Sequence, residues 1–413
     1  MAQPAFIIGI SVVSILCMLV RPRGIVEAYW ACGGALLLVI TRLVSWGDAA
    51  YAVREGLDVY LFLTGMMILA EMARAEGVFD WVADIAARSA RGSSARLFTL
   101  VYLTGMVVTT LLSNDATAVV LTPAVLAVVR KARVGPKPHV LACALIANAA
   151  SFVLPISNPA NLVVYGSHIP PLLHWLRLFL LPSIAAVVLT FIGLRLLSKR
   201  DLQMKVQSLE EPSELAPSGR LALAGLVLAC AALIVASAVG ADLGAPTCGA
   251  AVLVLLLVTW RDRSMPRTVL KGVSWSVLPL VAGLFVIVQG LQTAGLLQSE
   301  LHVLERLARW PSLAANLAAA FGVGLASNAM NNLPMGLISG AAVRAASAHD
   351  GIAHSLLIGV DLGPNLSVTG SLATILWLIA LRRENVEISA WQFFKVGILV
   401  MPPALLGSIL LLR

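Results

Sequence analysis

The chain has 413 residues, of which 59% are hydrophobic and 12% are charged, and its mean hydropathy is +0.91. Because a soluble domain carries roughly 25% charged residues, this composition excludes a soluble globular protein and predicts an all-α polytopic membrane protein. The net charge of +8 does not require a nucleic acid as partner, since the basic residues of membrane proteins gather on cytoplasmic loops.

The residue types that carry catalysis and metal binding are scattered along the chain. The five cysteines form no C-x-x-C pair, and the six histidines show no metal-ligand spacing. The sequence contains no nucleophile elbow, zincin motif, phosphate loop or dinucleotide fingerprint. We therefore predict that the protein is not an enzyme and holds neither a structural metal nor a cofactor.

The first half of the chain predicts apolar spans that polar residues interrupt twice. No basic stretch precedes the first span, so it is expected to stay in the membrane rather than act as a cleavable signal peptide. In chain order the predicted elements are spans over 4–20, 24–44 and 57–73, an amphipathic segment over 78–91, a hairpin over 97–131, a broken span over 138–165 and a long span over 172–197. The polar stretch 198–220 is the predicted cytoplasmic linker.

The second half repeats this order. Its predicted elements are spans over 221–240, 245–260 and 272–295, an amphipathic segment over 296–309, a hairpin over 311–346, a broken span over 352–381 and a last span over 391–412. The residues that match between the halves are Gly65 and Gly77 with Gly283 and Gly295, Ser113-Asn114 with Ser327-Asn328, and Asn148 with Asp361. We therefore predict two membrane repeats, residues 1–197 and 221–413.

Each half is predicted to cross the bilayer five times, so the second repeat is inverted relative to the first. This topology has about ten crossing spans plus two broken or re-entrant hairpins. With the N-terminus outside, 22 Lys and Arg residues fall on the cytoplasmic side and seven fall outside, a bias that sets the orientation. We expect a multi-pass protein of the cell inner membrane with both termini outside.

Two short polar stretches lie in the middle of nearly uncharged runs. Ser113-Asn114-Asp115 lies within 97–129, where Asp115 is the only charged residue, and Ser327 to Pro334 lies within 310–343, where there is none. Such a stretch interrupts a helix where lipid offers no hydrogen-bond partner, so it is tolerated only where it lines a protein cavity. Broken helices at matching positions of two halves predict a binding site near the midplane.

The predicted site combines the two hairpin tips with the second break of each half. Its substrate-binding candidates are neutral amide and hydroxyl residues, namely Ser113, Asn114, Asn158, Ser327, Asn328, Asn331, Asn332 and Asn365. Because these breaks hold no Lys or Arg, the lining suits a small, neutral, hydroxylated solute or a cation better than a polyanion. The alternative is that these residues only join helices by interhelical hydrogen bonds.

Asp115 and Asp361 are the acidic residues deepest in otherwise uncharged spans. An intramembrane carboxylate is costly and marks a functional site by default, so both residues are candidates for proton coupling. A static hydrogen-bonding role is the alternative. Glu27, Glu71 and Asp58 lie nearer the span ends, where a solvated structural role is expected.

Three stretches of the chain carry a family pattern: LLSNDATAVVLTPAVLAV at 111–128, SNAMNNLPMGLISGA at 327–341 and GVDLGPNLSVTGSLATILWL at 359–378. They resemble the ArsB-type arsenite/antimonite permeases of the ion transporter superfamily. Dicarboxylate carriers of that superfamily have Ser-Asn-Thr at both tips, whereas this chain has Ser-Asn-Asp and Ser-Asn-Ala. Sodium/proton antiporter relatives are less easily distinguished. The stretch LPISNPAN at 154–161 departs from the common Thr-Pro-Ile-Gly type, which leaves the role of Asn158 open.

The resemblance implies export of arsenite and antimonite from the cytoplasm in exchange for protons. The cargo would be arsenic(III) as its uncharged trihydroxide, held by the substrate-binding candidates while Asp115 or Asp361 carries the proton. The implied partners are this small inorganic solute, protons and the lipid bilayer, and not nucleic acid. Some family members dock a soluble cytoplasmic arsenite-stimulated ATPase, and that partner and a homodimer are left open. The alternatives are a cation/proton antiporter or an organic-anion symporter on the same scaffold, or the membrane subunit of an ATP-driven arsenite pump.

Overall fold

The computed structural model describes residues 2–166, 169–204, 214–260, 262–345 and 350–412. All regular secondary structure among these residues is helical, which confirms the predicted all-α class. Residues 205–213 of the predicted linker and residue 346 of the second hairpin lie outside the described residues.

The described part of the first half contains eleven α-helices, and each polar break lies between two of them. They are α1 (Ala2–Val20), α2 (Glu27–Ile40), α3 (Trp46–Glu55), α4 (Leu57–Ala75), α5 (Val78–Ser89), α6 (Ser94–Leu111), α7 (Asn114–Ala116), α8 (Thr122–Lys131), α9 (Lys137–Ala149), α10 (Pro159–Tyr165) and α11 (Leu172–Leu197). A π-helical turn, Thr117–Leu121, joins α7 to α8, and a 3₁₀ turn, Pro155–Ser157, precedes α10.

The second half follows the same order, with ten α-helices among its described residues. They are α12 (Pro217–Ala238), α13 (Gly244–Thr259), α14 (Met265–Gly272), α15 (Val277–Thr293), α16 (Leu296–Leu307), α17 (Ser312–Met330), α18 (Asn332–Ala345), α19 (Asp350–Leu362), α20 (Leu372–Arg383) and α21 (Ala390–Leu410). Two 3₁₀ turns, η6 (Gly363–Leu366) and η7 (Val368–Gly370), lie between α19 and α20.

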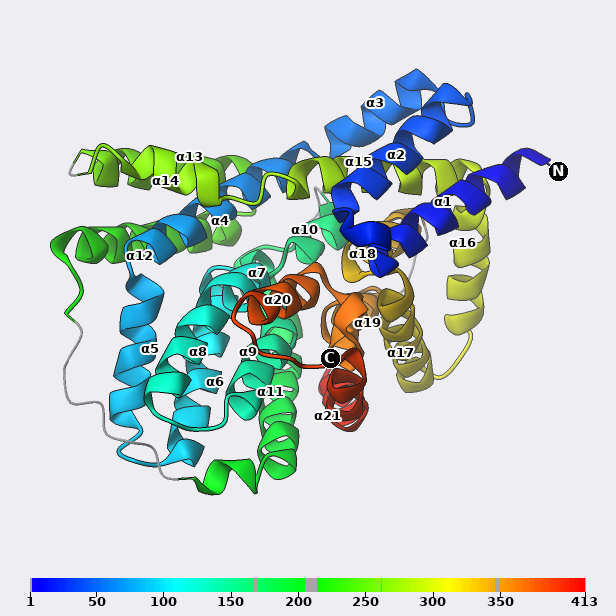
Figure 1. Cartoon of the computed structure of the whole chain (residues 1–413). Helices are drawn as coiled ribbons and strands as arrows, with labels where there is room; N and C mark the ends of the chain where they lie inside the picture. The colour runs from blue at the N-terminus through cyan, green and yellow to red at the C-terminus, as the bar shows by residue number, and fades with distance from the viewer. Residues whose placement is uncertain (1, 167–168, 205–213, 261, 346–349, 413) are drawn as a thin grey trace.

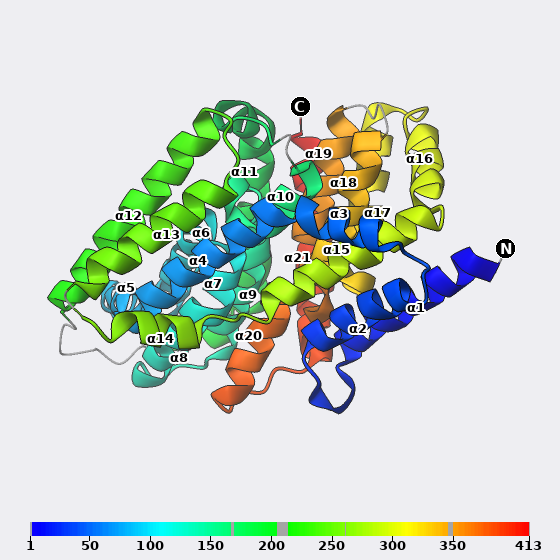
Figure 2. The ribbon, with the colours of Figure 1, turned by 90° about the horizontal axis from the view of Figure 1, so that it is seen from above.

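The helices form two groups in space (Figure 1). Helices α1–α4 and α12–α15 run across the top of the view, and the hairpins and broken helices of both halves lie beneath them. The view from above shows α4 passing over the helices of the first hairpin, and α15 crossing the centre of the molecule beside α17 and α18 (Figure 2). The polar breaks therefore lie where the two groups of helices meet.

The predicted hairpins are present as pairs of helices with a break between them. The first is α6 followed by α7 and α8, broken at Leu112, and the second is α17 followed by α18, broken at Asn331. Helices α3 and α14 occupy stretches for which no helix was predicted. Helix α3 begins after Ser45, whose hydroxyl accepts a hydrogen bond from the Asp48 backbone N–H at 3.0 Å.

Among the described residues, six helical segments are long and apolar enough to cross a membrane: Ser94–Leu111, Leu172–Leu197, Pro217–Ala238, Met265–Thr293, Ser312–Met330 and Ala390–Leu410. Helices α3 and α4 would together form a seventh, bent by 45°. Helices α2 and α13 have only 14 and 16 residues, short of the roughly 20 that a span usually needs. The predicted count of about ten crossings therefore includes these shorter helices and the broken ones.

The two halves exchange packing partners. Helix α4 of the first half packs along α13 of the second, and α15 packs along α2. Gly65 on α4 lies so close to α13 that an added Cβ would be 2.6 Å from the carbonyl carbon of Thr247. Gly283 on α15 meets α2 in the same way, with an added Cβ 2.8 Å from the carbonyl carbon of Ala31. This exchange is the contact pattern that a two-fold relation between inverted repeats produces.

The second predicted glycine pair also occupies equivalent positions. Gly77 precedes α5 with a φ of 71°, and Gly295 precedes α16 with a φ of 92°. Only glycine adopts this left-handed backbone without cost, so each half uses the same residue to redirect the chain from a span into an amphipathic helix. The boundaries of the repeats at 198–220 remain a prediction.

Candidate functional site

The first hairpin turns where α6 ends. Leu112 leaves the helix, and Ser113 is fully extended (φ −178°, ψ 165°). The Ser113 hydroxyl accepts a hydrogen bond from the backbone N–H of Ala116 at 3.2 Å, which is the N-cap geometry that starts a new helix. The hydroxyl oxygens of Thr109 and Thr117 lie 2.8 Å apart and join the two arms of the hairpin.

The two polar residues after this cap have different surroundings. Asn114 is buried, and its side-chain oxygen accepts a hydrogen bond from the backbone N–H of Asp115 at 2.9 Å. Asp115 and Ser113 line a cavity of about 70 Å³, here called the first-tip cavity, together with Glu71 on α4 and Gly272 at the end of α14. The first tip therefore presents a hydroxyl and a carboxylate to a small space.

The second hairpin turns at Asn331, whose φ of 78° and ψ of 152° lie in a backbone region that glycine alone adopts freely. Its backbone N–H donates to the Ser327 carbonyl at 2.7 Å and closes α17, and α18 begins at the buried Asn332. The Ser327 hydroxyl is buried without a hydrogen-bond partner among the described residues. Asn331 lines a cavity of about 20 Å³ with Glu27 and Pro334, here called the second-tip cavity.

Asn328 ties the second tip to the break between α19 and α20. Its side-chain nitrogen donates to the carbonyls of Gly324 at 2.7 Å and of Gly363 at 3.0 Å. The side-chain oxygen of Asn328 accepts a hydrogen bond from the Ser367 hydroxyl at 2.6 Å. Its backbone carbonyl accepts a hydrogen bond from the Thr369 hydroxyl at 2.9 Å. Both donors and the acceptor of the amide are therefore used within the protein.

The break of the first half is held by an aspartate of the second. The side-chain nitrogen of Asn158 donates to Oδ1 of Asp361 at 2.7 Å, and its oxygen accepts from the Ala160 backbone N–H at 3.0 Å, which caps α10. Asp361 is fully buried, and its Oδ2 has no hydrogen-bond partner among the described residues.

The break of the second half is held in the same way by an asparagine of the first. The side-chain nitrogen of Asn148 donates to the Asn365 oxygen at 3.0 Å, and the Asn365 nitrogen donates to the Leu145 carbonyl at 3.1 Å. Asn148 and Asp361 occupy equivalent positions in the sequence match between the two halves. Each therefore reaches across to the other half and binds an asparagine at its break.

The structure divides the predicted site residues into three groups. Ser113 and Asp115 line the first-tip cavity, and Asn331 lines the second-tip cavity. Asn328 is half-buried in the hydrogen-bonded tie described above. The remaining candidates are buried in the packed interior, namely Asn114, Asn158, Ser327, Asn332, Asp361 and Asn365. The two tips therefore face separate small cavities rather than one shared pocket.

A vestibule of about 830 Å³ adjoins both small cavities. It shares Glu71 and Ser274 with the first-tip cavity, and Glu27 and Leu280 with the second-tip cavity. Its charged lining residues are equally divided by sign, with Arg21, Arg74, Lys271 and Arg383 against Glu27, Glu71, Asp80 and Glu384. Because a cleft concentrates solutes of opposite charge only when one sign dominates its lining, this vestibule favours neither anions nor cations.

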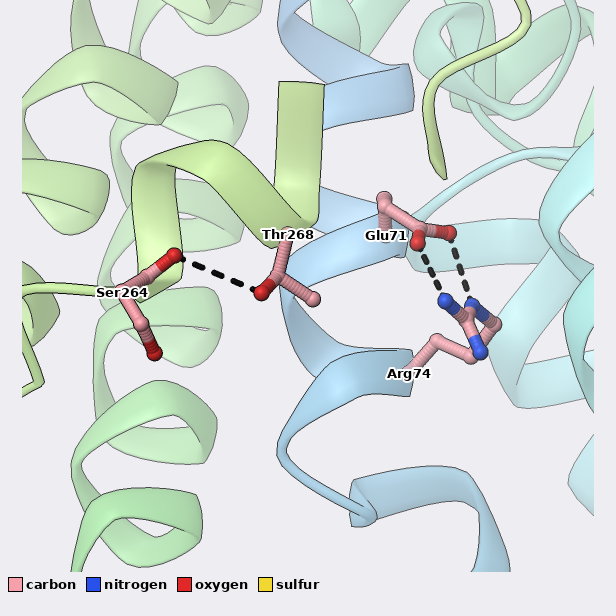
Figure 3. Close-up of polar contacts among 4 residues, drawn as sticks. All are labelled: Glu71, Arg74, Ser264 and Thr268. Atoms are coloured by element: carbon pink, nitrogen blue, oxygen red, sulfur yellow. Dashed lines mark hydrogen bonds and ion pairs between the residues drawn. The ribbon is translucent and has the colours of Figure 1, made fainter. Parts of the chain in front are cut away.

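Glu27 and Glu71, two carboxylates that line the vestibule, are buried in ion pairs. The prediction that they are solvated is therefore wrong. Glu71 is 7% exposed and accepts hydrogen bonds from two nitrogens of Arg74, with Nε at 2.8 Å (Figure 3). Glu27 is 6% exposed and pairs with Arg21, and burial, together with nearby Arg382, lowers the pKa of Arg21. The spacing of Glu71 and Arg74, three residues apart on a helix, was a signal for pairing.

Apolar spans, two broken hairpins and a vestibule that reaches both tips define a membrane transporter. The chain belongs to the citrate transporter family, whose sequence profile matches residues 8–362. The matched residues include both hairpins and end with α19, just before the break that follows it.

Bacterial arsenical pump membrane proteins are similar to this protein over nearly the whole chain. The arsenical pump membrane protein of Escherichia coli (strain K12) is 29% identical over 410 residues, covering 96% of this chain and 95% of that protein. The arsenical pump membrane protein of Yersinia enterocolitica is 27% identical over 413 residues, with the same two coverages. These matches confirm the resemblance found in the sequence. Among solved structures, the YdaH transporter of Alcanivorax borkumensis has a TM-score of 0.49 at 14% identity, covering 88% of this chain and 86% of that chain.

Proposed function

We propose that the protein is a secondary transporter that exports arsenite, and antimonite with it, from the cytoplasm in exchange for protons. The lining of the first-tip cavity carries this proposal, because its polar side chains are Ser113, Ser274, Asp115 and Glu71, and no lysine or arginine is among the described residues that line it. Citrate is a polyanion, and the Asp115 carboxylate would repel it, since Arg74 is already paired with Glu71 and no cation of the lining is left to bind citrate. The uncharged trihydroxide of arsenic(III) can both donate and accept hydrogen bonds with hydroxyl and carboxylate groups. The relatives named arsenical pump membrane proteins support this substrate.

The size of the first-tip cavity fits a solute of a few heavy atoms. A cavity holds one water when the volume open to the centre of a water-sized sphere is roughly 10–15 Å³. The volume of about 70 Å³ therefore corresponds to several waters or one small oxyacid. A tricarboxylate would require the cavity to widen.

Proton exchange supplies enough driving force for a neutral cargo. One proton moving in against one neutral solute moving out transfers one charge, worth about 2.3 kcal/mol per 100 mV. That energy supports roughly a fifty-fold solute gradient, so one titrating carboxylate is sufficient. We assign this role first to Asp115, which lines the cavity, and second to Asp361, which is bound by Asn158.

In this proposal residues 1–197 and 221–413 are inverted repeats joined by a cytoplasmic linker at 198–220, and both termini lie outside the inner membrane. Arg21, Lys271 and Arg383 of the vestibule come from loops predicted to be cytoplasmic. The vestibule would therefore open to the cytoplasm, where an exporter collects its solute. Neither a soluble ATPase nor a homodimer is required for this exchange.

Everted membrane vesicles that contain the wild-type chain provide the test. We expect them to accumulate arsenite when the vesicle interior is acidified, without ATP, and to lose the solute when a protonophore is added. Uptake that requires ATP would instead indicate the membrane subunit of an ATP-driven pump. Failure to accumulate arsenite under either condition would overturn the proposal.

A cation/proton antiporter is the second candidate, because the Asp115 carboxylate, with no lysine or arginine among the described lining residues, also suits a small cation. The same vesicles distinguish the two functions. Addition of sodium or potassium to acid-loaded vesicles should release protons from an antiporter, whereas an arsenite exporter should respond to arsenite alone.

A further inference from the structure

Glu71 lies on the boundary between the vestibule and the first-tip cavity. It lines both spaces, whereas its partner Arg74 lines only the vestibule and Asp115 lines only the cavity. The two members of the ion pair also differ in their access to water, since the side chain of Glu71 is 9% exposed and that of Arg74 is 49% exposed. The arginine can therefore turn into the vestibule, whereas the carboxylate must stay where it is.

The end of α14 is shaped around this carboxylate. A Cβ added at Gly272 would overlap Oε1 of Glu71, so the backbone itself closes one side of the acid. Figure 3 shows α14, in which the Thr268 hydroxyl donates to the Ser264 carbonyl, beside the Glu71–Arg74 pair on α4. The open sides of Glu71 are those that face Arg74 and the first-tip cavity.

We propose that Glu71 is a second proton-carrying carboxylate of the transport path and that its ion pair with Arg74 is a latch between the vestibule and the first-tip cavity. This role rests on the proposed proton-coupled transport. When Arg74 turns away, Glu71 is a buried carboxylate without its cation, a state that is strongly unfavourable. It then accepts the proton that Asp115 has carried inward, directly or through one water in the cavity, and Asp115 is left ionised.

The return of Arg74 completes the step. The guanidinium favours the ionised form of the carboxylate, so Glu71 gives its proton to vestibule water and the ion pair forms again. Besides Glu71, the charged residues that line the vestibule or the first-tip cavity are Arg21, Glu27, Arg74, Asp80, Asp115, Lys271, Arg383 and Glu384. Among the described residues, Arg74 is the one bonded to Glu71, so its removal should change proton transfer most.

Arsenite uptake by everted vesicles, measured against the pH of the bath, tests the latch because the bath then faces the vestibule. The Glu71→Gln variant should lose at least about ten-fold in uptake, since a positioned acid or base typically contributes 10²–10⁴-fold, and should respond weakly to bath pH. The Arg74→Gln variant should need a higher bath pH for half-maximal uptake, because the ion pair that forms when Glu71 releases its proton is then missing. Glu71→Asp should restore the pH response at a lower rate.

Asp84 offers a matched control, since its side chain is 15% exposed and pairs with Lys131 at 4.0 Å but lines neither the vestibule nor the first-tip cavity. The Asp84→Asn variant should keep the wild-type rate and pH profile. A wild-type profile in Glu71→Gln would overturn the latch and leave the proposed function standing. If Glu71→Gln does not reach the membrane, an unshifted profile in Arg74→Gln overturns it instead. Absence of proton-driven uptake in the wild type would overturn both.

Discussion

The two hairpin tips carry the same Ser-Asn pair and use it in opposite ways. At the first tip Ser113 caps the next helix, and the residue after the pair, Asp115, faces a cavity. At the second tip Asn328 is bound by the loop between α19 and α20, and the residue after the pair is Ala329. The first tip therefore has a group that can titrate, whereas the second has a fixed amide and no charge.

Under the proposed function, this difference gives the two hairpin tips different roles in transport. A carboxylate beside a cavity can bind and release a proton as its surroundings change. An amide whose donors and acceptor are all satisfied holds backbone in place and has little capacity left for a solute. We infer that the first tip carries the coupling chemistry and that the second tip fixes the shape of the break beside it.

Replacement of Asp115 by Asn should have the largest effect. The amide keeps the size of the side chain but cannot exchange a proton, so proton-driven arsenite uptake should fall by about 100-fold or more. Uptake by everted vesicles, normalised to the amount of protein in the membrane, measures the change. Full transport by this variant would show that the contrast between the tips does not concern coupling, and Asp361 would become the remaining candidate.

The Asn328→Ala substitution should act on stability. It removes three side-chain hydrogen bonds, each worth about 1 kcal/mol, so the free energy of unfolding should fall by about 2–4 kcal/mol. Thermal unfolding of the purified protein measures this loss. Transport per folded molecule should stay within about two-fold of the wild type, and a much larger fall would assign Asn328 to the solute site instead.

Helices α4 and α15 should respond alike, because each packs along a helix of the other half. Gly65→Ala and Gly283→Ala each place a methyl group against the backbone of a helix from the other half, which should destabilise the protein by about 1–3 kcal/mol. Gly249→Ala and Gly33→Ala are matched controls on α13 and α2, since an added Cβ meets nothing within 4 Å there. Unequal losses at Gly65 and Gly283 would weaken the two-fold relation.

The sequence predicted those parts of the fold that depend on local composition. A nearly uncharged run with a polar centre was enough to predict both hairpins. The matched glycines predicted only a repeat, and the structure adds that they lie at equivalent helix contacts and turns. The pairing of Asn158 with Asp361, 203 residues apart, could not be predicted, because neither residue carries a local signal of its partner. The burial of Glu71 likewise depends on the backbone of Gly272, which only the folded chain brings to it.

Short helices were missed for a different reason. Helix α14 has eight residues, and Arg267 and Lys271 lie within it, so its composition is that of a cytoplasmic loop. Its helical form depends on packing against α4, where Gly272 meets Glu71. A short segment with the composition of a loop can still form a helix when one of its faces is buried against the rest of the protein.

The smallest predicted effect concerns the cap at the first tip. Ser113→Ala removes the hydrogen bond to the Ala116 N–H, and the loss of an N-cap costs about 1 kcal/mol. Because α7 has only three residues, this loss should loosen Asp115 rather than unfold the protein. Arsenite uptake should fall by a few-fold, with its pH dependence retained, and Ser113→Thr should restore it. An effect as large as that of Asp115→Asn would show that the hydroxyl binds the solute and does more than cap a helix.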